Sequence, residues 1–117
     1  MPDSVNVARL REAVLEDSEF MGELVEIFLT EVGDQLISLE RAIASEDWPS
    51  ITMTAHRLRG ASGNVGAEEL ARLCYELELR AETGAVERFH GAGLREEFER
   101  VRSALQDCVL QAKSEGR

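Results

Sequence analysis

His56 is the residue of this 117-residue chain whose type and surroundings are best suited to chemistry. On a helical wheel of residues 48–64 it points away from the apolar positions and shares its face with Thr52, Gly60 and Gly63. A neutral imidazole presents one unprotonated nitrogen and can act as a nucleophile. Glycine inside a helix costs about 1 kcal/mol relative to alanine. The two glycines therefore indicate either a hollow that lets another protein approach the ring or close packing between helices.

The helix that carries this histidine is predicted to be locally basic. Met53 and Arg59 flank the histidine face, Arg57 follows the histidine directly, and no acidic residue occurs between Pro49 and Ala67. The chain as a whole has a formal net charge of −10, and residues 1–49 alone hold 12 acids and 3 bases. A dianionic group bound at the histidine would therefore meet a cationic surface on an otherwise acidic protein.

The other reactive side chains form no recognisable site. Cys74 and Cys108 lie on apolar helical stripes and are interpreted as reduced core residues. The sequence contains no Cys-x-x-Cys or His-x-x-x-His spacing for a metal and no Ser-His-Asp arrangement. The abundant glutamates lack the convergent polar set that a carboxylate hydrolase needs. His90, beside Phe89 in a glycine-rich stretch, is interpreted as a loop residue.

Composition narrows the classes of partner. With 23 acidic and 13 basic residues, the chain is not expected to bind nucleic acid or anionic membranes, because both attract basic patches. No apolar stretch approaches 18 residues, and the N-terminal residues lack a hydrophobic signal core, so we expect a cytoplasmic protein. The length predicts a single domain over residues 1–117, with a core that needs no disulfide or metal.

The elements that must position His56 are predicted to be helices. Residues 4–15 have a short helical pattern, and a helix of some 28 residues begins at Asp17. The latter carries one apolar stripe made of Phe20, Leu24, Ile27, Phe28, Val32, Leu36, Leu39 and Ile43. The histidine helix spans about residues 48–64, with Asp47 as its N-cap and Asn64 or Gly66 at its end. Its inner face consists of Ile51, Ala55, Leu58, Ser62 and Val65.

Two further helices complete the prediction. The fourth begins near Ala67 and stops at Thr83-Gly84, and its buried stripe is Leu70, Leu73, Cys74, Leu77 and Ala81. A loop through Gly84, Gly91 and Gly93 follows, and the last helix carries Leu94, Phe98, Val101, Leu105, Cys108 and Ala112. Amphipathic helices with short connections predict an all-α, up-down-up-down four-helix bundle with a short N-terminal covering helix.

The histidine segment resembles a known family. Ala55-His56-Arg57-Leu58-Arg59-Gly60, with Gly66 after five more residues, is similar to the signature Ala-His-x-Leu-Lys-Gly-x5-Gly of histidine-containing phosphotransfer (HPt) domains. The run Leu70-x-x-Leu73-Cys74-x-x-Leu77-Glu78 resembles the family's next helix. The motifs cover roughly residues 17–83. They imply a four-helix bundle with an exposed, phosphorylatable histidine on its second long helix.

The resemblance also implies a mechanism. His56 would accept a phosphoryl group on Nε2 from the phospho-aspartate of one receiver domain and pass it to another. The implied partners are receiver domains of response regulators and of a hybrid sensor histidine kinase, which would supply the aspartate and a metal ion. Arg59 is expected to pair with the phosphoryl oxygens and Arg57 to assist. Gly60, Gly63, Thr52 and Met53 are expected to form the partner access surface. Such a chain is a phosphocarrier rather than an enzyme.

Several alternatives remain open in the sequence. The family usually has lysine where this chain has Arg59, which changes the geometry available to the phosphate because a guanidinium is planar and bidentate. A bundle of the same ancestry could instead bind a receiver or kinase without carrying phosphate. The chain could be a free-standing carrier, which we favour, or a domain of a larger kinase. We expect a monomer, because no helix shows an obvious second apolar stripe.

Overall fold

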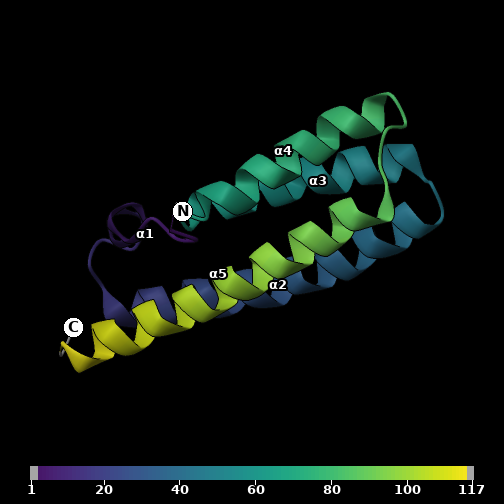
Figure 1. Ribbon diagram of the computed structural model, residues 1–117. Coiled ribbons are helices and arrows are strands. Elements are labelled where there is room, and N and C mark those ends of the chain that lie inside the picture. The colour runs from purple at the N-terminus through teal and green to yellow at the C-terminus, as the bar shows by residue number, and fades with distance from the viewer. Residues whose placement is uncertain (1–2, 116–117) are drawn as a thin grey trace.

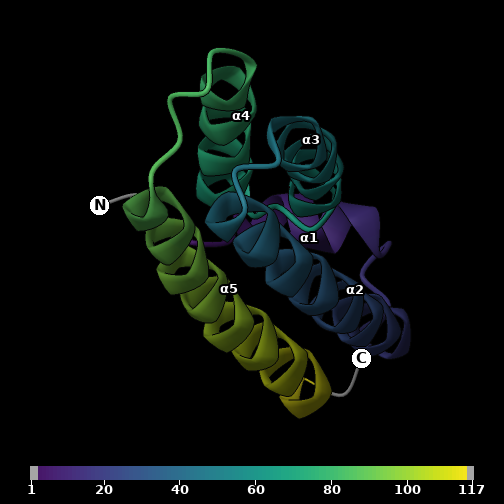
Figure 2. The same cartoon turned by 90° about the vertical axis from the view of Figure 1, so that its right-hand side faces the viewer.

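A computed structural model describes residues 3–115 and shows an all-helical protein (Figure 1). Its elements are α1 (Val7–Ala13), α2 (Ser18–Ala44), α3 (Trp48–Asn64), α4 (Glu68–Glu82) and α5 (Arg88–Ser114). The second helix packs against α3 and α5, and α4 packs against the same two helices, which closes a four-helix bundle. Figure 2 shows α3 and α4 as one pair lying across the pair formed by α2 and α5. The predicted architecture is confirmed.

Side-chain caps define where α2 and α3 begin. The Asp17 carboxylate accepts hydrogen bonds from the backbone N–H groups of Glu19 and Phe20 at the start of α2. The Asp47 carboxylate accepts from the N–H and the hydroxyl of Ser50 at the start of α3. These acceptors satisfy N–H groups that have no partner inside the helix. Both predicted helix starts are confirmed.

The core positions predicted for α3 are also confirmed. All five members of its predicted inner face are buried, together with large side chains of the neighbouring helices such as Leu36, Leu77 and Phe98. Leu73 and Cys108, which were predicted on buried stripes, lie half-buried at the edge of this core. Because the inner face of α3 is fixed by the core, its opposite face must point outwards.

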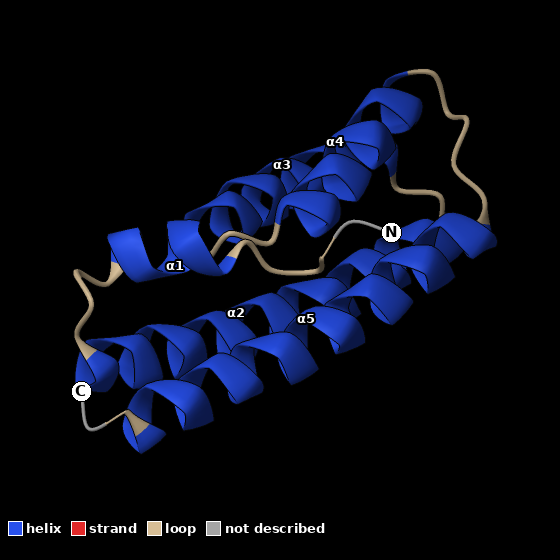
Figure 3. Ribbon diagram, turned by 60° about the vertical axis from the view of Figure 1, so that its left-hand side comes forward, coloured by secondary structure: helices blue, strands red, loops and turns tan. Residues whose placement is uncertain are grey.

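The covering helix fills the space left by unequal helix lengths. At 1.5 Å per residue, the 27 residues of α2 and of α5 reach about 40 Å, whereas α3 reaches only about 26 Å. The first helix lies beyond the end of α3 and α4, over the start of α2 (Figure 3). Its Leu10 and the following Val14 are fully buried, and Arg11 forms an ion pair with Glu115 at 3.1 Å. The predicted covering role is confirmed.

Gly66 joins this cover to the turn between α3 and α4. Its carbonyl accepts a 2.7 Å hydrogen bond from the Asn6 N–H, and its φ of +77° lies in the left-handed region. A Cβ at this position would stand 2.7 Å from the Asn6 carbonyl oxygen. Both the conformation and the close approach require glycine here.

The predicted start of the last helix is wrong. The fifth helix begins at Arg88, so Gly91, Gly93 and His90 belong to its first two turns rather than to a loop. The Glu87 N–H donates to His90 Nδ1 at 2.9 Å, which caps the helix start. Gly91 is buried against α2, where a Cβ would stand 3.2 Å from Ile43 Cδ1. The glycine allows close packing of α5 on α2, whereas the sequence predicted it to lie in a loop.

The predicted apolar stripe of α2 is wrong in its first third. Phe20 and Ile27 are exposed and Leu24 is half-buried, while Met21 and Val25 are buried in their place. Apolar residues stand side by side at each of these turns, so the pattern fits two faces one residue apart. Packing against the neighbouring helices chooses between them. The remainder of the stripe, from Phe28 to Ile43, is confirmed.

Within the described residues, no helix is both long enough and apolar enough to cross a membrane.

Candidate functional site

His56 lies midway along the outer face of α3, on the side where α3 meets α4. Its side chain is 62% exposed, as the helical wheel predicted. The buried positions Ala55 and Leu58 on either side of it anchor the helix in the core. The ring is therefore held on a rigid element while one of its edges stays open to another protein.

Two charged side chains compete for the inner nitrogen of this ring. His56 Nδ1 lies 3.0 Å from Glu78 Oε1 on α4 and 3.0 Å from Nη2 of Arg59. One nitrogen cannot both donate a hydrogen bond to the carboxylate and accept one from the guanidinium. The two contacts correspond to opposite tautomers of the imidazole.

Burial decides this competition in favour of the carboxylate. The side chain of Glu78 is only 15% exposed, whereas that of Arg59 is 38% exposed and has access to water. An unprotonated Nδ1 would turn its lone pair towards a poorly solvated carboxylate oxygen, which is repulsive. A protonated Nδ1 donates to Glu78, and the lone pair is then on Nε2. The geometry thus favours the tautomer whose outer nitrogen is nucleophilic.

Arg59 is held beside the ring by two other contacts. Its Nε lies 3.6 Å from Glu78 Oε2, an oxygen for which no described group supplies a hydrogen bond. Its guanidinium carbon lies 4.9 Å from the centre of the Tyr75 ring on α4, which is a cation–π arrangement. Arg59 thus lies between the histidine and the face of an aromatic ring.

Arg57 is not brought to the site. It is exposed, and among residues 3–115 its side chain forms no hydrogen bond or ion pair. Neighbouring helical residues point about 100° apart, so the Arg57 side chain leaves α3 in a different direction from His56. Within the described residues it forms no hydrogen bond with the histidine.

The glycines beside the histidine leave open space. A Cβ at Gly60 or at Gly63 would meet no described atom within 4 Å outside the helix's own backbone. Close packing between helices therefore does not explain either glycine. Of the two interpretations offered by the sequence, this favours a hollow beside the histidine. Thr52 is half-buried, and Met53 is 52% exposed. We call the surface formed by Thr52, Met53, His56, Gly60 and Gly63 the His56 face.

The covering helix contributes a cation to one end of this face. Arg9 is exposed on α1, and its Nε donates a 3.1 Å hydrogen bond to the carbonyl oxygen of Gly63. That carbonyl lies seven residues, or about two helical turns, beyond His56. Sequence reasoning did not place Arg9 at the site, because the contact depends on how α1 folds over the turn after α3.

Exposed apolar side chains also occur on the two helices that pack against α3. Tyr75 and Leu79 are exposed on α4, and Phe20 and Ile27 are exposed on α2. The face of α2 that meets α5 is marked by Gly22 and Gly33, whose Cβ positions point at Val109 and Phe98. At about 100° per residue, Phe20 and Ile27 lie on the flank turned away from α5.

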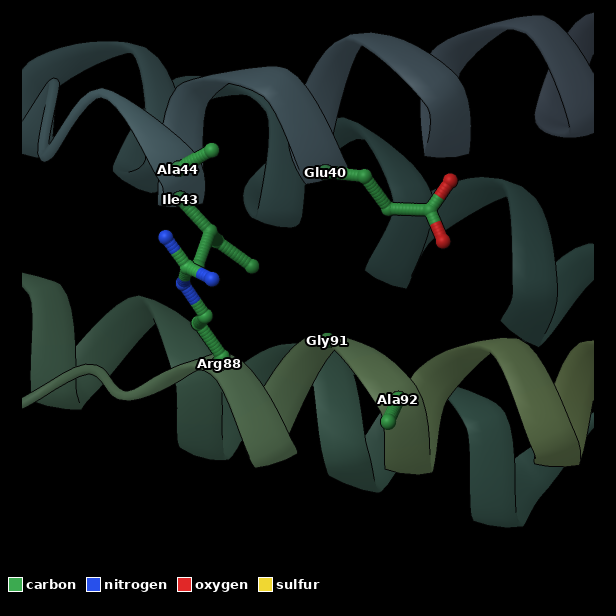
Figure 4. A pocket seen from close by; sticks show the side chains of 6 residues that line it. All are labelled: Glu40, Ile43, Ala44, Arg88, Gly91 and Ala92. Atoms are coloured by element: carbon green, nitrogen blue, oxygen red, sulfur yellow. The ribbon is translucent and has the colours of Figure 1, made fainter.

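A separate hollow of about 360 Å³ lies between the end of α2 and the start of α5. Figure 4 shows Arg88 reaching from α5 towards Ile43, with Gly91 further along α5 and Glu40 extending away from Arg88. Glu40 is engaged by Arg95, with Nε at 3.2 Å from its Oε2. The residues that line this hollow are Glu40, Ile43, Ala44, Arg88, Gly91 and Ala92, and they include no histidine, cysteine or hydroxyl side chain.

The two cysteines are unsuited to chemistry. Burial raises the pKa of the Cys74 thiol to about 12, with a further contribution from the negative charge of Glu78. Burial also raises the pKa of Cys108, followed by the effect of Asp107. Both thiols are free and lack the lowered pKa of a reactive cysteine.

Like Arg9, Glu78 and Tyr75 are site residues that sequence reasoning missed. Glu78 was noted only as part of a family pattern. It lies beside the buried Cys74 and Leu77, at the edge of the apolar stripe of α4. This position was the sequence feature that could have indicated a contact with a neighbouring helix. Which neighbouring helix that edge meets depends on the bundle and not on α4 alone.

Comparisons with known proteins agree with this site. The family model described as Hpt domain matches residues 23–104. The structure is similar to a crystal structure of histidine-containing phosphotransfer protein B (HptB) from Pseudomonas aeruginosa PAO1, with a TM-score of 0.82 and 28% sequence identity. The match covers 95% of this chain and 98% of that chain. No curated protein matches significantly. The chain therefore belongs to the Hpt domain family, the histidine phosphotransfer modules of two-component signalling.

Proposed function

We propose that this protein is a phosphocarrier that receives a phosphoryl group on Nε2 of His56 from a receiver-domain phospho-aspartate and passes it to a second receiver domain. One observation carries the proposal: an exposed histidine whose inner nitrogen is tied to a carboxylate of the neighbouring helix. This arrangement leaves the outer nitrogen unprotonated and accessible. The donor would be a hybrid sensor kinase and the acceptor a response regulator, both acting in the cytoplasm.

The bond changes in this transfer need no proton to move. The lone pair of His56 Nε2 attacks phosphorus, the N–P bond forms, and the P–O bond to the aspartate breaks. The bonding pair stays on the leaving carboxylate. Nδ1 keeps its proton throughout, so the phosphorylated ring is formally cationic, and Glu78 lies 3.0 Å away to stabilise that charge. The reverse sequence of bond changes delivers the group to the second receiver.

A local cation beside the ring favours the phosphorylated state. Phosphoryl transfer depends mainly on in-line positioning and on neutralising the transferred group. Arg59 is the cation nearest to the ring and can turn a planar pair of N–H groups towards phosphoryl oxygens. Arg57 is proposed only to meet the partner's surface, because its side chain has no contact with the histidine.

The His56 face is proposed to receive the partner. The open space over Gly60 and Gly63 lets a receiver's loop approach the ring. Exposed apolar residues, Met53 on this face and Leu79 on α4, offer area that is buried on association. We propose a monomer that uses this face for partners. The second helix does carry a second set of apolar residues, the exposed Phe20 and Ile27, which the sequence was not expected to have.

The decisive test compares the two histidines of the chain. The purified protein is mixed with ³²P-labelled phosphorylated receiver domains from the same genome, and separately with phosphoramidate, a small donor that needs no docking. Wild type and His90→Gln are expected to gain acid-labile phosphate, and His56→Gln is expected to gain none. Normal labelling of His56→Gln would show that the proposed carrier role is wrong.

The same experiment separates the carrier from a docking module. A module that only binds receivers would bind them with wild-type affinity but acquire no acid-labile phosphate from either donor. The exposed histidine, whose inner nitrogen contacts Glu78, favours the carrier, since a docking module has no need of a nucleophilic ring.

A further inference from the structure

We propose that Tyr75 is a positioning residue that acts through Arg59: its ring is a platform that keeps the guanidinium beside His56 and available to the phosphoryl group. This inference rests on the proposed phosphocarrier function and extends it to a residue of α4. It also connects two features of this chain, the arginine at position 59 and the tyrosine at position 75.

The first step of the argument concerns what holds Arg59 before phosphorylation. With the proton on Nδ1, the 3.0 Å contact between His56 and Arg59 joins two donors and does not hold the guanidinium in place. Two stabilising contacts remain: the carboxylate of Glu78, 3.6 Å away, and the ring of Tyr75, 4.9 Å from the guanidinium carbon. The aromatic ring is thus one of only two anchors that the described chain gives this cation.

The second step concerns what happens without the ring. Glu78 Oε2 accepts no hydrogen bond from any part of the chain that the structure describes, so it is an unsatisfied acceptor next to Arg59. If the platform is removed, the guanidinium is free to close on Glu78 and form a direct hydrogen-bonded ion pair. That pair would compete with the Nδ1 proton of His56 for the carboxylate and would draw the cation away from Nε2.

The third step explains why the platform suits arginine. A guanidinium stacked on an aromatic face keeps its N–H groups in its own plane, where they remain free to donate to phosphoryl oxygens. An ammonium group is a compact point charge without such a plane. The contribution of Tyr75 should therefore depend on arginine at position 59 and largely disappear when lysine replaces it.

A double-mutant cycle tests this dependence. The variants are Tyr75→Leu, Tyr75→Phe as the matched control that keeps the ring, Arg59→Lys, and the double variant Tyr75→Leu/Arg59→Lys. Two rates are measured for each: labelling of His56 by phosphoramidate and hydrolysis of the phosphoprotein. Thermal unfolding followed by circular dichroism checks that each variant folds.

A neutral reagent separates positioning of the cation from a general structural effect. Diethyl pyrocarbonate acylates an unprotonated imidazole nitrogen but carries no charge for Arg59 to bind. His56→Gln supplies the contribution of His90 to that signal. Loss of a positioned cation should slow labelling by the anionic phosphoryl donor more than acylation by the neutral reagent.

We expect Tyr75→Leu to slow phosphoramidate labelling by about two- to fivefold, the range that an exposed cation–π contact supports. Tyr75→Phe should match wild type, and Tyr75→Leu should have little further effect in the Arg59→Lys background. Equal rates for Tyr75→Leu and wild type, or an equal loss in the lysine background, would overturn the inference while leaving the carrier function intact. Failure of wild-type His56 to gain phosphate from both phosphoramidate and phosphorylated receiver domains would instead refute the proposed function itself.

Discussion

His56 on α3 and Glu78 on α4 are 22 positions apart in the chain and are joined by a 3.0 Å contact between Nδ1 and a carboxylate oxygen. The contact joins the two helices that pack most extensively against each other in the bundle. It also favours a proton on Nδ1, the tautomer that leaves the lone pair on Nε2. The chemical character of the exposed histidine is thus set by a side chain from a neighbouring helix.

Removing the carboxylate should weaken the nucleophile without removing it. In Glu78→Ala, Nδ1 loses its charged acceptor and Arg59 is free to donate to it, which shifts the proton towards Nε2. Because charge-assisted hydrogen bonds contribute about 1.5–3 kcal/mol, we expect phosphoramidate labelling to fall by about tenfold or more.

Glu78→Gln is the matched control for this prediction. Its amide oxygen can still accept from Nδ1, so its labelling rate should lie between those of wild type and Glu78→Ala. The rates are measured from pH 5.5 to 8.5 to separate loss of the tautomer from a change in titration. Equal labelling rates for Glu78→Ala and wild type would contradict the assigned tautomer.

Gly60→Ala should make the protein more stable and less active with receivers. The added methyl group meets open space in the free protein and raises the helix propensity of α3, so unfolding should become harder by about 0.5–1 kcal/mol. The same methyl group occupies the hollow beside His56. We expect receiver-dependent transfer to slow, with a smaller effect on phosphoramidate labelling.

Gly93→Ala provides a close control. Gly93 is also helical and has open space at its Cβ position, but it lies on α5. It should gain stability without losing transfer, as measured by urea denaturation and by receiver-dependent labelling. If both variants transfer at the wild-type rate, the hollow over α3 has no role in docking.

Arg9→Ala should weaken docking while leaving the chemistry intact. Arg9 is held on the Gly63 carbonyl at the end of the His56 face, about two turns from the histidine. Charges at the rim of an interface mainly affect association and its salt dependence. We expect a raised KM for the phosphorylated receiver, unchanged phosphoramidate labelling, and a difference from wild type that shrinks at high salt.

Lys113→Ala serves as the charge-matched control for Arg9, since it removes one cation from the far end of α5. Both variants change the net charge by the same amount. An equal rise in KM for the two would assign the effect to net charge and contradict a specific role for Arg9.

The buried Cys74 thiol should resist modification in the folded protein, and its burial should make the folded state less stable at alkaline pH. In Cys108→Ser, the remaining Cys74 should resist a disulfide reagent at pH 8 until urea unfolds the chain, because its pKa is raised to about 12. Unfolded Cys74 ionises near its ordinary pKa of 9.0, so its contribution to stability is complete below pH 9 and is lost as the pH rises towards 12. Rapid reaction of Cys74 under native conditions would contradict its burial.

Much of this protein could be predicted from local sequence. The capping residues Asp17 and Asp47, the buried face of α3 and the exposure of His56 all follow from the order of side chains along one helix. Errors arose where one helix offered two equivalent choices. The paired apolar residues at the start of α2 fit two faces, and Gly91 fits either a helix break or a close contact.

The sequence by itself determined that a histidine stands outward on a basic helix of a helical bundle, because helical periodicity and charge are properties of neighbouring residues. Only the tertiary structure decided what touches that histidine. Glu78 and Tyr75 come from α4 and Arg9 comes from α1, and their approach depends on how helices cross and on where the covering helix ends. Such contacts join residues that are distant in the chain, and no local pattern encodes a distance between two helices.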